Sequence, residues 1–82
     1  MLKVKSEVME LRGVANKQSA QGKVYYIVNV ETMDGTPHQF YCPDATALPQ
    51  GLKKGDNVVL TFDVKYYKNQ ESLVVANVEK AS

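Results

Sequence analysis

The residues from Gln21 to Met33 form the longest run rich in β-branched and aromatic side chains, and such a run predicts a strand. Successive side chains of a strand point to opposite faces. The even positions of this run are apolar, whereas the odd positions are mixed and begin with Lys23 and Tyr25. We therefore expect an inner wall made of Val24, Tyr26, Val28 and Val30, and an outer surface made of Lys23, Tyr25, Ile27, Asn29 and Glu31.

The segment before this run, from Leu2 to Leu11, reads as a first strand whose alternation changes phase. Val4 and Val8 share the parity of Leu2, whereas Met9 shares that of Leu11. One extra residue in a β-bulge flips the alternation and bends the strand. A bent first strand is typical of small closed barrels. The alternative is an unbent strand with Met9 exposed.

The segments between strands carry turn signals. The polar stretch from Gly13 to Gly22 has no hydrophobic period, which predicts a loop or the flexible tip of a β-hairpin. Asp34-Gly35 predicts a tight turn before a third strand, from Thr36 to Cys42, whose Phe40 we expect to face inward. After Pro43 the chain favours at most one helical turn, which Asp44 would cap.

The last third of the sequence predicts two more strands, separated by a turn over residues 68–71. A core face is expected for Val58, Leu60, Phe62, Val64 and Tyr66, and the final strand for Ser72 to Glu79. The chain is thus expected to be an all-β, five-stranded OB-like barrel with a long loop between its first two strands. An SH3-like barrel is the main alternative. With 82 residues the chain is long enough for one domain, covering residues 1–82.

Composition limits the classes of function. The net charge of +1 argues against a strongly basic nucleic-acid binder, although the segment from Arg12 to Lys23 holds three cations and no acid. No apolar run approaches the ~18–20 residues of a membrane span, and no signal-peptide pattern is present. The single cysteine, Cys42, cannot form an internal disulfide. We therefore expect no membrane partner and a cytoplasmic location, which the resemblance described below would narrow to a bacterial or phage-infected host cell.

The sequence offers little to a catalytic mechanism. On one strand, His38 and Cys42 would lie on the same face but about 13 Å apart, too far for a nucleophile–base pair or a shared metal ion. No glycine-rich phosphate loop and no convergent carboxylate pair is evident. We expect no catalytic residues, no metal or other cofactor and no small-molecule substrate.

Aromatic and basic residues alternate in three places: around Tyr25, at Phe40-Tyr41, and in Lys65-Tyr66-Tyr67-Lys68. Single-stranded nucleic acids bind by stacking bases on aromatic rings while cations follow the phosphates. One ring of Tyr66 and Tyr67 is expected to be exposed, without indication of which. The candidate nucleic-acid-binding residues are Arg12, Lys17, Lys23, Tyr25, Ile27, Tyr41, Lys65, Tyr66, Tyr67 and Lys68.

The segment Gln21-Gly22-Lys23 followed by Tyr25, after a polar hairpin tip and a long first strand, resembles the small single-stranded DNA-binding proteins of filamentous phages and related mobile elements. The chain length, the start Met1-Leu2-Lys3-Val4 and the late Ser72-Leu73 fit as well. The resemblance spans nearly the whole chain through sparse matches. It implies an OB-like barrel that acts as a symmetric dimer and coats single strands cooperatively with little sequence preference.

The resemblance also implies roles for particular residues. The family has a long hairpin wing that carries basic residues, and a tyrosine on the adjoining strand stacks on bases; Lys23 and Tyr25 hold these positions here. Ala15 and Ala20 stand where the family has wing arginines, and Asn69-Gln70-Glu71 replace an exposed aromatic that Tyr66 or Tyr67 would supply from just upstream. These departures predict lower affinity.

The leading hypothesis is a non-catalytic, non-sequence-specific single-stranded DNA-binding homodimer that coats and protects DNA during phage or mobile-element replication. RNA remains open as a second ligand. The alternative is a small β-barrel protein-interaction or assembly module, in which the tyrosines form a protein interface. Salt separates the two hypotheses, because nucleic-acid binding weakens steeply as salt rises.

Overall fold

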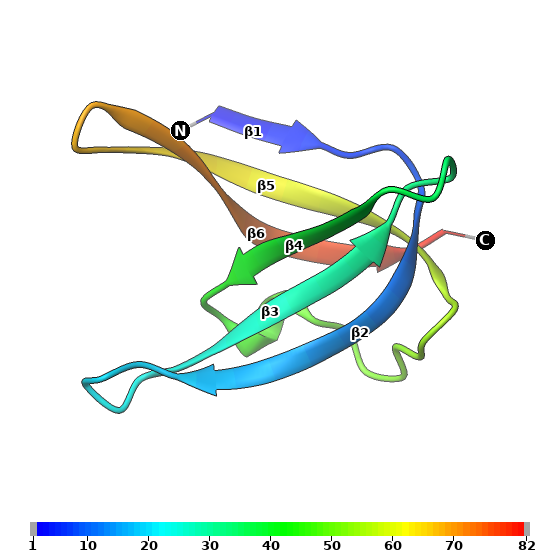
Figure 1. The fold of residues 1–82 in the computed structure, drawn as a ribbon, viewed down its shortest axis with the longest axis horizontal. Helices are drawn as coiled ribbons and strands as arrows, with labels where there is room; N and C mark the ends of the chain where they lie inside the picture. The colour runs from blue at the N-terminus through cyan, green and yellow to red at the C-terminus, as the bar shows by residue number, and fades with distance from the viewer. Residues whose placement is uncertain (1, 82) are drawn as a thin grey trace.

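The computed structural model describes residues 2–81, and for Tyr67 only the backbone (Figure 1). Strands account for most of the chain, and one short 3-10 helix, η1, lies between the fourth and fifth strands. The elements are β1 (Leu2–Lys5), β2 (Met9–Gln18), β3 (Val24–Glu31), β4 (Pro37–Cys42), η1 (Ala45–Ala47), β5 (Asn57–Tyr67) and β6 (Gln70–Lys80).

The strands form one sheet in the order β1-β5-β2-β3-β4-β6, and a further pairing of β5 with β6 closes it into a barrel. β1 and the beginning of β2 make up the predicted first strand, which the segment 6–8 divides, and both pair with β5. All pairings are antiparallel except that of β4 with β6, which meet in parallel where Tyr41 lies opposite Val74. The predicted all-β, five-stranded OB-like barrel is confirmed.

The predicted bulge in the first strand is confirmed by its register with β5. Lys5 lies opposite Thr61 and Met9 opposite Val58, so four residue steps on the first strand face three on β5. The extra residue reverses the alternation, and Met9 is buried rather than exposed. At the bend, the Ser6 N–H donates to the Leu60 carbonyl (2.8 Å), and the Ser6 hydroxyl accepts from the Leu60 N–H (2.9 Å).

The core fills the closed part of the barrel, where Tyr26, Phe40, Leu48 and Leu52 pack around a fully buried set. Phe40 faces inward as predicted, with its ring centroid 4.7 Å from that of Phe62. The buried apolar residues are Met9, Leu11, Val28, Val30, Cys42, Ala47, Val58, Leu60, Phe62, Val75 and Val78.

The expected long loop after the first strand is instead mostly strand. β2 continues to Gln18, opposite Val24, and only residues 19–23 form the turn. The polar stretch pairs through its backbone, so its strand needs no hydrophobic period. This β2–β3 hairpin extends beyond the barrel, which leaves Val24 49% exposed although its parity predicted a core position.

The β5–β6 hairpin also extends beyond the core. Tyr66, predicted to be a core residue, is 70% exposed because its part of β5 lies past the end of the barrel. The turn consists of Lys68 and Asn69, both with positive φ, as in type I′ hairpin turns. β6 therefore begins at Gln70, two residues before the predicted start.

Two shorter features match the sequence predictions. The Asp34-Gly35 turn joins β3 to β4 with Gly35 at φ 90°, and Asp44 caps η1 by accepting from the Thr46 N–H. Within residues 2–81, no helix has the length and apolar character needed to cross a membrane.

Candidate nucleic-acid interface

Tyr25 on β3 and Tyr41 on β4 form an aromatic pair on the outside of the barrel. Their ring centroids are 5.3 Å apart, and the ring planes are inclined by 52°. Tyr25 is half-buried, whereas Tyr41 is 44% exposed. This spacing is within the favourable range for tilted aromatic pairs, so each ring restricts the other. The pair therefore presents a fixed aromatic surface to solvent.

The residues around the pair are ordered by strand register. Lys17 on β2 lies opposite Tyr25, and Ile27 lies between Ala15 on β2 and Tyr41 on β4. Directly paired residues share a face of the sheet. We call this surface of β2, β3 and β4 the outer face. It is defined by Ala15, Lys17, Tyr25, Ile27, Asn29, Gln39 and Tyr41.

Two hairpins flank the outer face. In Figure 1 the β2–β3 and β5–β6 turns extend to the same side of the molecule, with the end of β4 between them. Lys23 lies in the first hairpin, two residues before Tyr25, while Lys65 and Lys68 belong to the second; all three are exposed. In OB-folds, oligonucleotides bind the face of the second and third barrel strands, which are β3 and β4 here. They also contact the two loops that correspond to these hairpins.

Arg12 is not at this end of the outer face. Leu11 lies opposite Val30 and Gly13 opposite Asn29, so Arg12 is an extra residue in a second β-bulge. Its guanidinium forms ion pairs with Glu10 (2.7 Å) and Glu31 (3.9 Å), which lie opposite each other in the ladder. The Glu10 hydrogen bond and the charge of Glu31 raise the pKa of Arg12. The charge of Arg12 is therefore offset by two carboxylates.

Tyr66 lies on the opposite surface of its hairpin from Lys65. The Tyr66 side chain points to the same side of β5 as Val64. On that side, beyond the end of the barrel, lie the exposed apolar residues Leu2, Val4 and Leu73. A groove of about 360 Å³ is lined there by Leu2, Val4, Val64, Glu71, Ser72 and Leu73. The Tyr67 side chain is outside the part of the structure that is described.

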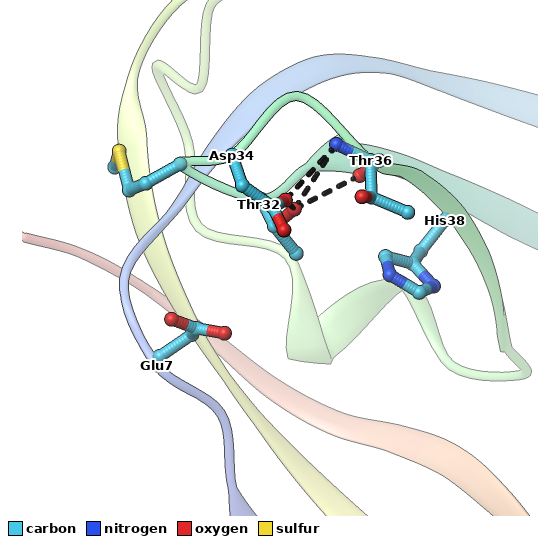
Figure 2. A pocket seen from close by; sticks show the side chains of 6 residues that line it. Glu7, Thr32, Asp34, Thr36 and His38 are labelled. Atoms are coloured by element: carbon cyan, nitrogen blue, oxygen red, sulfur yellow. Dashed lines mark hydrogen bonds between the residues drawn. The ribbon is translucent and has the colours of Figure 1, made fainter.

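Another pocket, of about 310 Å³, lies where the β3–β4 turn approaches the bend after β1, and it is acidic (Figure 2). The Thr32 hydroxyl donates to the Asp34 carboxylate, and this bond, with further bonds from Thr36, lowers the pKa of Asp34. Glu7 adds a second carboxylate, and the His38 ring stacks on Phe40 at 5.8 Å. A polyanion would be repelled here.

His38 and Cys42 do not act together. Cys42 is fully buried in the barrel, where burial raises the pKa of its thiol, and the thiol contacts the Asp44 carbonyl at 3.3 Å. His38 is exposed at the other end of β4.

Two outer-face residues were not singled out as binding candidates from the sequence. Asn29 and Gln39 lie opposite each other on β3 and β4, one row from Ile27 and Tyr41. The odd-position pattern of β3 already places Asn29 on the outer face. Gln39 could be added only when the register between β3 and β4 was known.

A comparison of the sequence with models of known protein families found no match, and a comparison with curated protein sequences found none either.

Proposed function

We propose that the chain is a non-catalytic protein that binds single-stranded DNA through its outer face and the two flanking hairpins. The observation that carries the proposal is the Tyr25–Tyr41 pair, on strands β3 and β4, whose outer face adjoins two hairpins that carry lysines. In this proposal it acts in a bacterial or phage-infected cytoplasm, where it coats and protects DNA during phage or mobile-element replication.

Stacking and charge divide the work of binding. Bases stack on Tyr41 and Tyr25, at ~1–3 kcal/mol per base, and Ile27 provides apolar contact beside them. Phosphates pair with Lys17, Lys23, Lys65 and Lys68, which occupy the hairpins on either side of the rings. Neither contact depends on base order, so binding is not sequence-specific. The net charge of +1 makes the affinity of one protomer modest.

The apolar groove supports a homodimer in which a second copy of the chain covers Leu2 and Leu73. These residues are 64% and 43% exposed, and the groove is continuous with β1, which within residues 2–81 is an edge strand paired with β5 alone. In a two-fold contact the same patch of each copy is buried by the other. Linking two modest binding sites raises the overall affinity without new contacts to DNA.

The dimer is tested by sedimentation of the wild type, Leu73→Lys and the control Met33→Lys, which changes an equally apolar, exposed residue on the β3–β4 turn. We expect the wild type and the control to be dimers and Leu73→Lys to be a monomer. A wild-type chain that stays monomeric at ~100 µM, well above ordinary dimer affinities, contradicts this part of the proposal.

The DNA-binding proposal is tested by fluorescence anisotropy with oligo-dT, oligo-U and duplex DNA over a salt series. Four phosphate contacts predict a slope of log affinity against log salt of roughly −3 for single strands. We expect oligo-dT to bind more tightly than the duplex. Tighter binding to oligo-U than to oligo-dT would identify RNA as the ligand. Absence of single-strand binding at low salt refutes the proposal.

A second candidate is a protein-interaction or assembly module, and the exposed apolar groove favours it. In that case the groove and the tyrosines would contact a protein, and the interaction would change little with salt because it rests on apolar area. The salt series thus discriminates between the two functions.

A further inference from the structure

The row of the outer face next to the tyrosines carries two amides, and the row beyond it on β3 holds Glu31, which is ion-paired with Arg12. Asn29 on β3 lies between Gly13 on β2 and Gln39 on β4. Rows on one face are about 7 Å apart along a strand, and neighbouring strands are about 5 Å apart. The amides of Asn29 and Gln39 are therefore close to each other and within reach of a base that covers Ile27 or stacks on Tyr41.

This row is open to a ligand. Apart from its two chain neighbours, an added Cβ at Gly13 would meet no atom of the described residues within 4 Å, so no other strand crosses the β2 side of the row. Gln39 is exposed, and its side chain has no hydrogen-bond partner among residues 2–81. The Asn29 amide nitrogen donates to the Ile27 carbonyl in a long contact of 3.5 Å. That bond uses a donor of Asn29 and leaves its side-chain oxygen without a partner in the described chain.

Amides suit base edges better than phosphates. A phosphate offers only acceptors and is best paired with cations, whereas an amide offers a donor pair and an acceptor. The Asn29 oxygen needs a donor, and a base whose 4- or 6-position faces it supplies one only where that position carries an amino group, as in cytosine and adenine. Thymine and uracil carry a carbonyl oxygen at position 4 and a donor only at N3, so in the same orientation they leave this acceptor unpaired.

We propose that Asn29 and Gln39 form a base-edge subsite that makes the chain prefer single strands whose bases carry exocyclic amino groups. This inference rests on the proposed DNA-binding function and deepens it. It adds a bias in base composition to stacking and phosphate contacts, which accept any base. Asn29 accepts from the amino group, and Gln39 pairs with the adjacent ring nitrogen.

Oligo-dC and oligo-dU of equal length are the sharpest probes, because both bases stack weakly and differ only at two positions. Cytosine has a 4-amino group and an N3 acceptor, whereas uracil has a 4-oxo group and an N3–H donor. Affinities are measured by anisotropy at pH 8 for the wild type and for Asn29→Val, Gln39→Leu and the control Gln50→Leu. Gln50 is an exposed glutamine outside the outer face, in the segment after η1.

We expect wild type and Gln50→Leu to bind oligo-dC about fivefold to tenfold more tightly than oligo-dU, the size of one well-formed hydrogen bond. Asn29→Val and Gln39→Leu should reduce that ratio to about twofold or less, with the salt slope unchanged. A stability role of the two amides would shift the melting temperature and leave the ratio intact. Equal wild-type affinity for oligo-dC and oligo-dU overturns the subsite alone, whereas no binding to either overturns the proposed function.

Discussion

Tyr25 and Tyr41 lie on neighbouring strands with their ring centroids 5.3 Å apart and their planes inclined by 52°. Because the rings restrict each other, removing either one affects both. We expect Tyr25→Ala and Tyr41→Ala each to weaken oligo-dT binding by ~1–3 kcal/mol. The double variant should lose less than the sum of the two, because each single change already loosens the remaining ring. Strict additivity would show that the two rings bind independently.

Tyr26, next to Tyr25, points to the other side of β3 and packs against the core. Its ring is half-buried, so Tyr26→Ala should reduce the free energy of unfolding by about 2–3 kcal/mol, somewhat less than a fully buried aromatic. Affinity of the folded variant for oligo-dT should stay within about twofold of the wild type. Chemical denaturation and anisotropy on the same sample measure the two quantities. If Tyr25→Ala and Tyr26→Ala both only unfold the protein, the division between outer face and core is wrong.

Ser6 completes the hydrogen bonding of a buried strand at the bend of the first strand. Its hydroxyl accepts from the N–H of Leu60, whose side chain is fully buried. In Ser6→Ala this N–H loses its partner, at a cost of about 1–3 kcal/mol in unfolding free energy. Ser72→Ala, an exposed serine on β6, is the matched control and should be near neutral. A Ser6→Ala protein as stable as the control would show that water replaces the hydroxyl.

Arg12 separates Glu10 from Glu31, which face each other across the β2–β3 ladder. Like charges at directly opposite positions destabilise a sheet. We expect Arg12→Gln to lower the melting temperature and to change the salt slope of oligo-dT binding by less than Lys68→Asn does. Asn suits the positive φ of position 68, so Lys68→Asn removes a cation while keeping the turn. If Arg12→Gln lowers the slope by roughly 0.7, as for one lost phosphate contact, Arg12 belongs to the interface.

Three aspartates predict sensitivity to acid. Hydrogen bonds from the Thr32 hydroxyl, the Thr46 N–H and the Lys53 N–H lower the pKa of Asp34, Asp44 and Asp56, respectively. A carboxylate with a depressed folded pKa stabilises the fold above its unfolded pKa of about 3.9, and this contribution disappears as pH falls through the folded value.

The melting temperature should therefore be steady above about pH 5 and fall at lower pH. Replacing all three aspartates with asparagine, which keeps an acceptor oxygen at each turn, should flatten this fall. An equal fall in the triple variant would assign the acid sensitivity to other groups.

The barrel and its bend could be predicted because buried positions of a strand are apolar and alternate with exposed ones along the sequence. The phase change between Val8 and Met9 records the extra residue of the bulge, and the alternation in β3 and β5 records their inner faces. The β2–β3 hairpin could not be delimited, because a strand that pairs only through its backbone outside the core has no hydrophobic period. Tyr66 was misplaced because parity indicates a face and not where the barrel ends.

The candidate site was only partly visible for a related reason. The sequence identified Tyr25 and Tyr41 one by one, but their contact depends on the β3–β4 register. Tyr41 also lies beside Val74 because β4 and β6, which are distant in the sequence, pair in parallel. The two carboxylate partners of Arg12 could be assigned only in three dimensions, because one of them depends on the β2–β3 register.

If the outer face and its two hairpins form the DNA-binding surface, an NMR titration of labelled protein with oligo-dT should locate them. We expect amide shifts to change at Tyr25, Ile27 and Tyr41 and in both hairpins, while those of Glu7 and Asp34 at the acidic pocket stay unchanged. Changes confined to the apolar groove or the acidic pocket, with an unperturbed outer face, would show that DNA does not bind there.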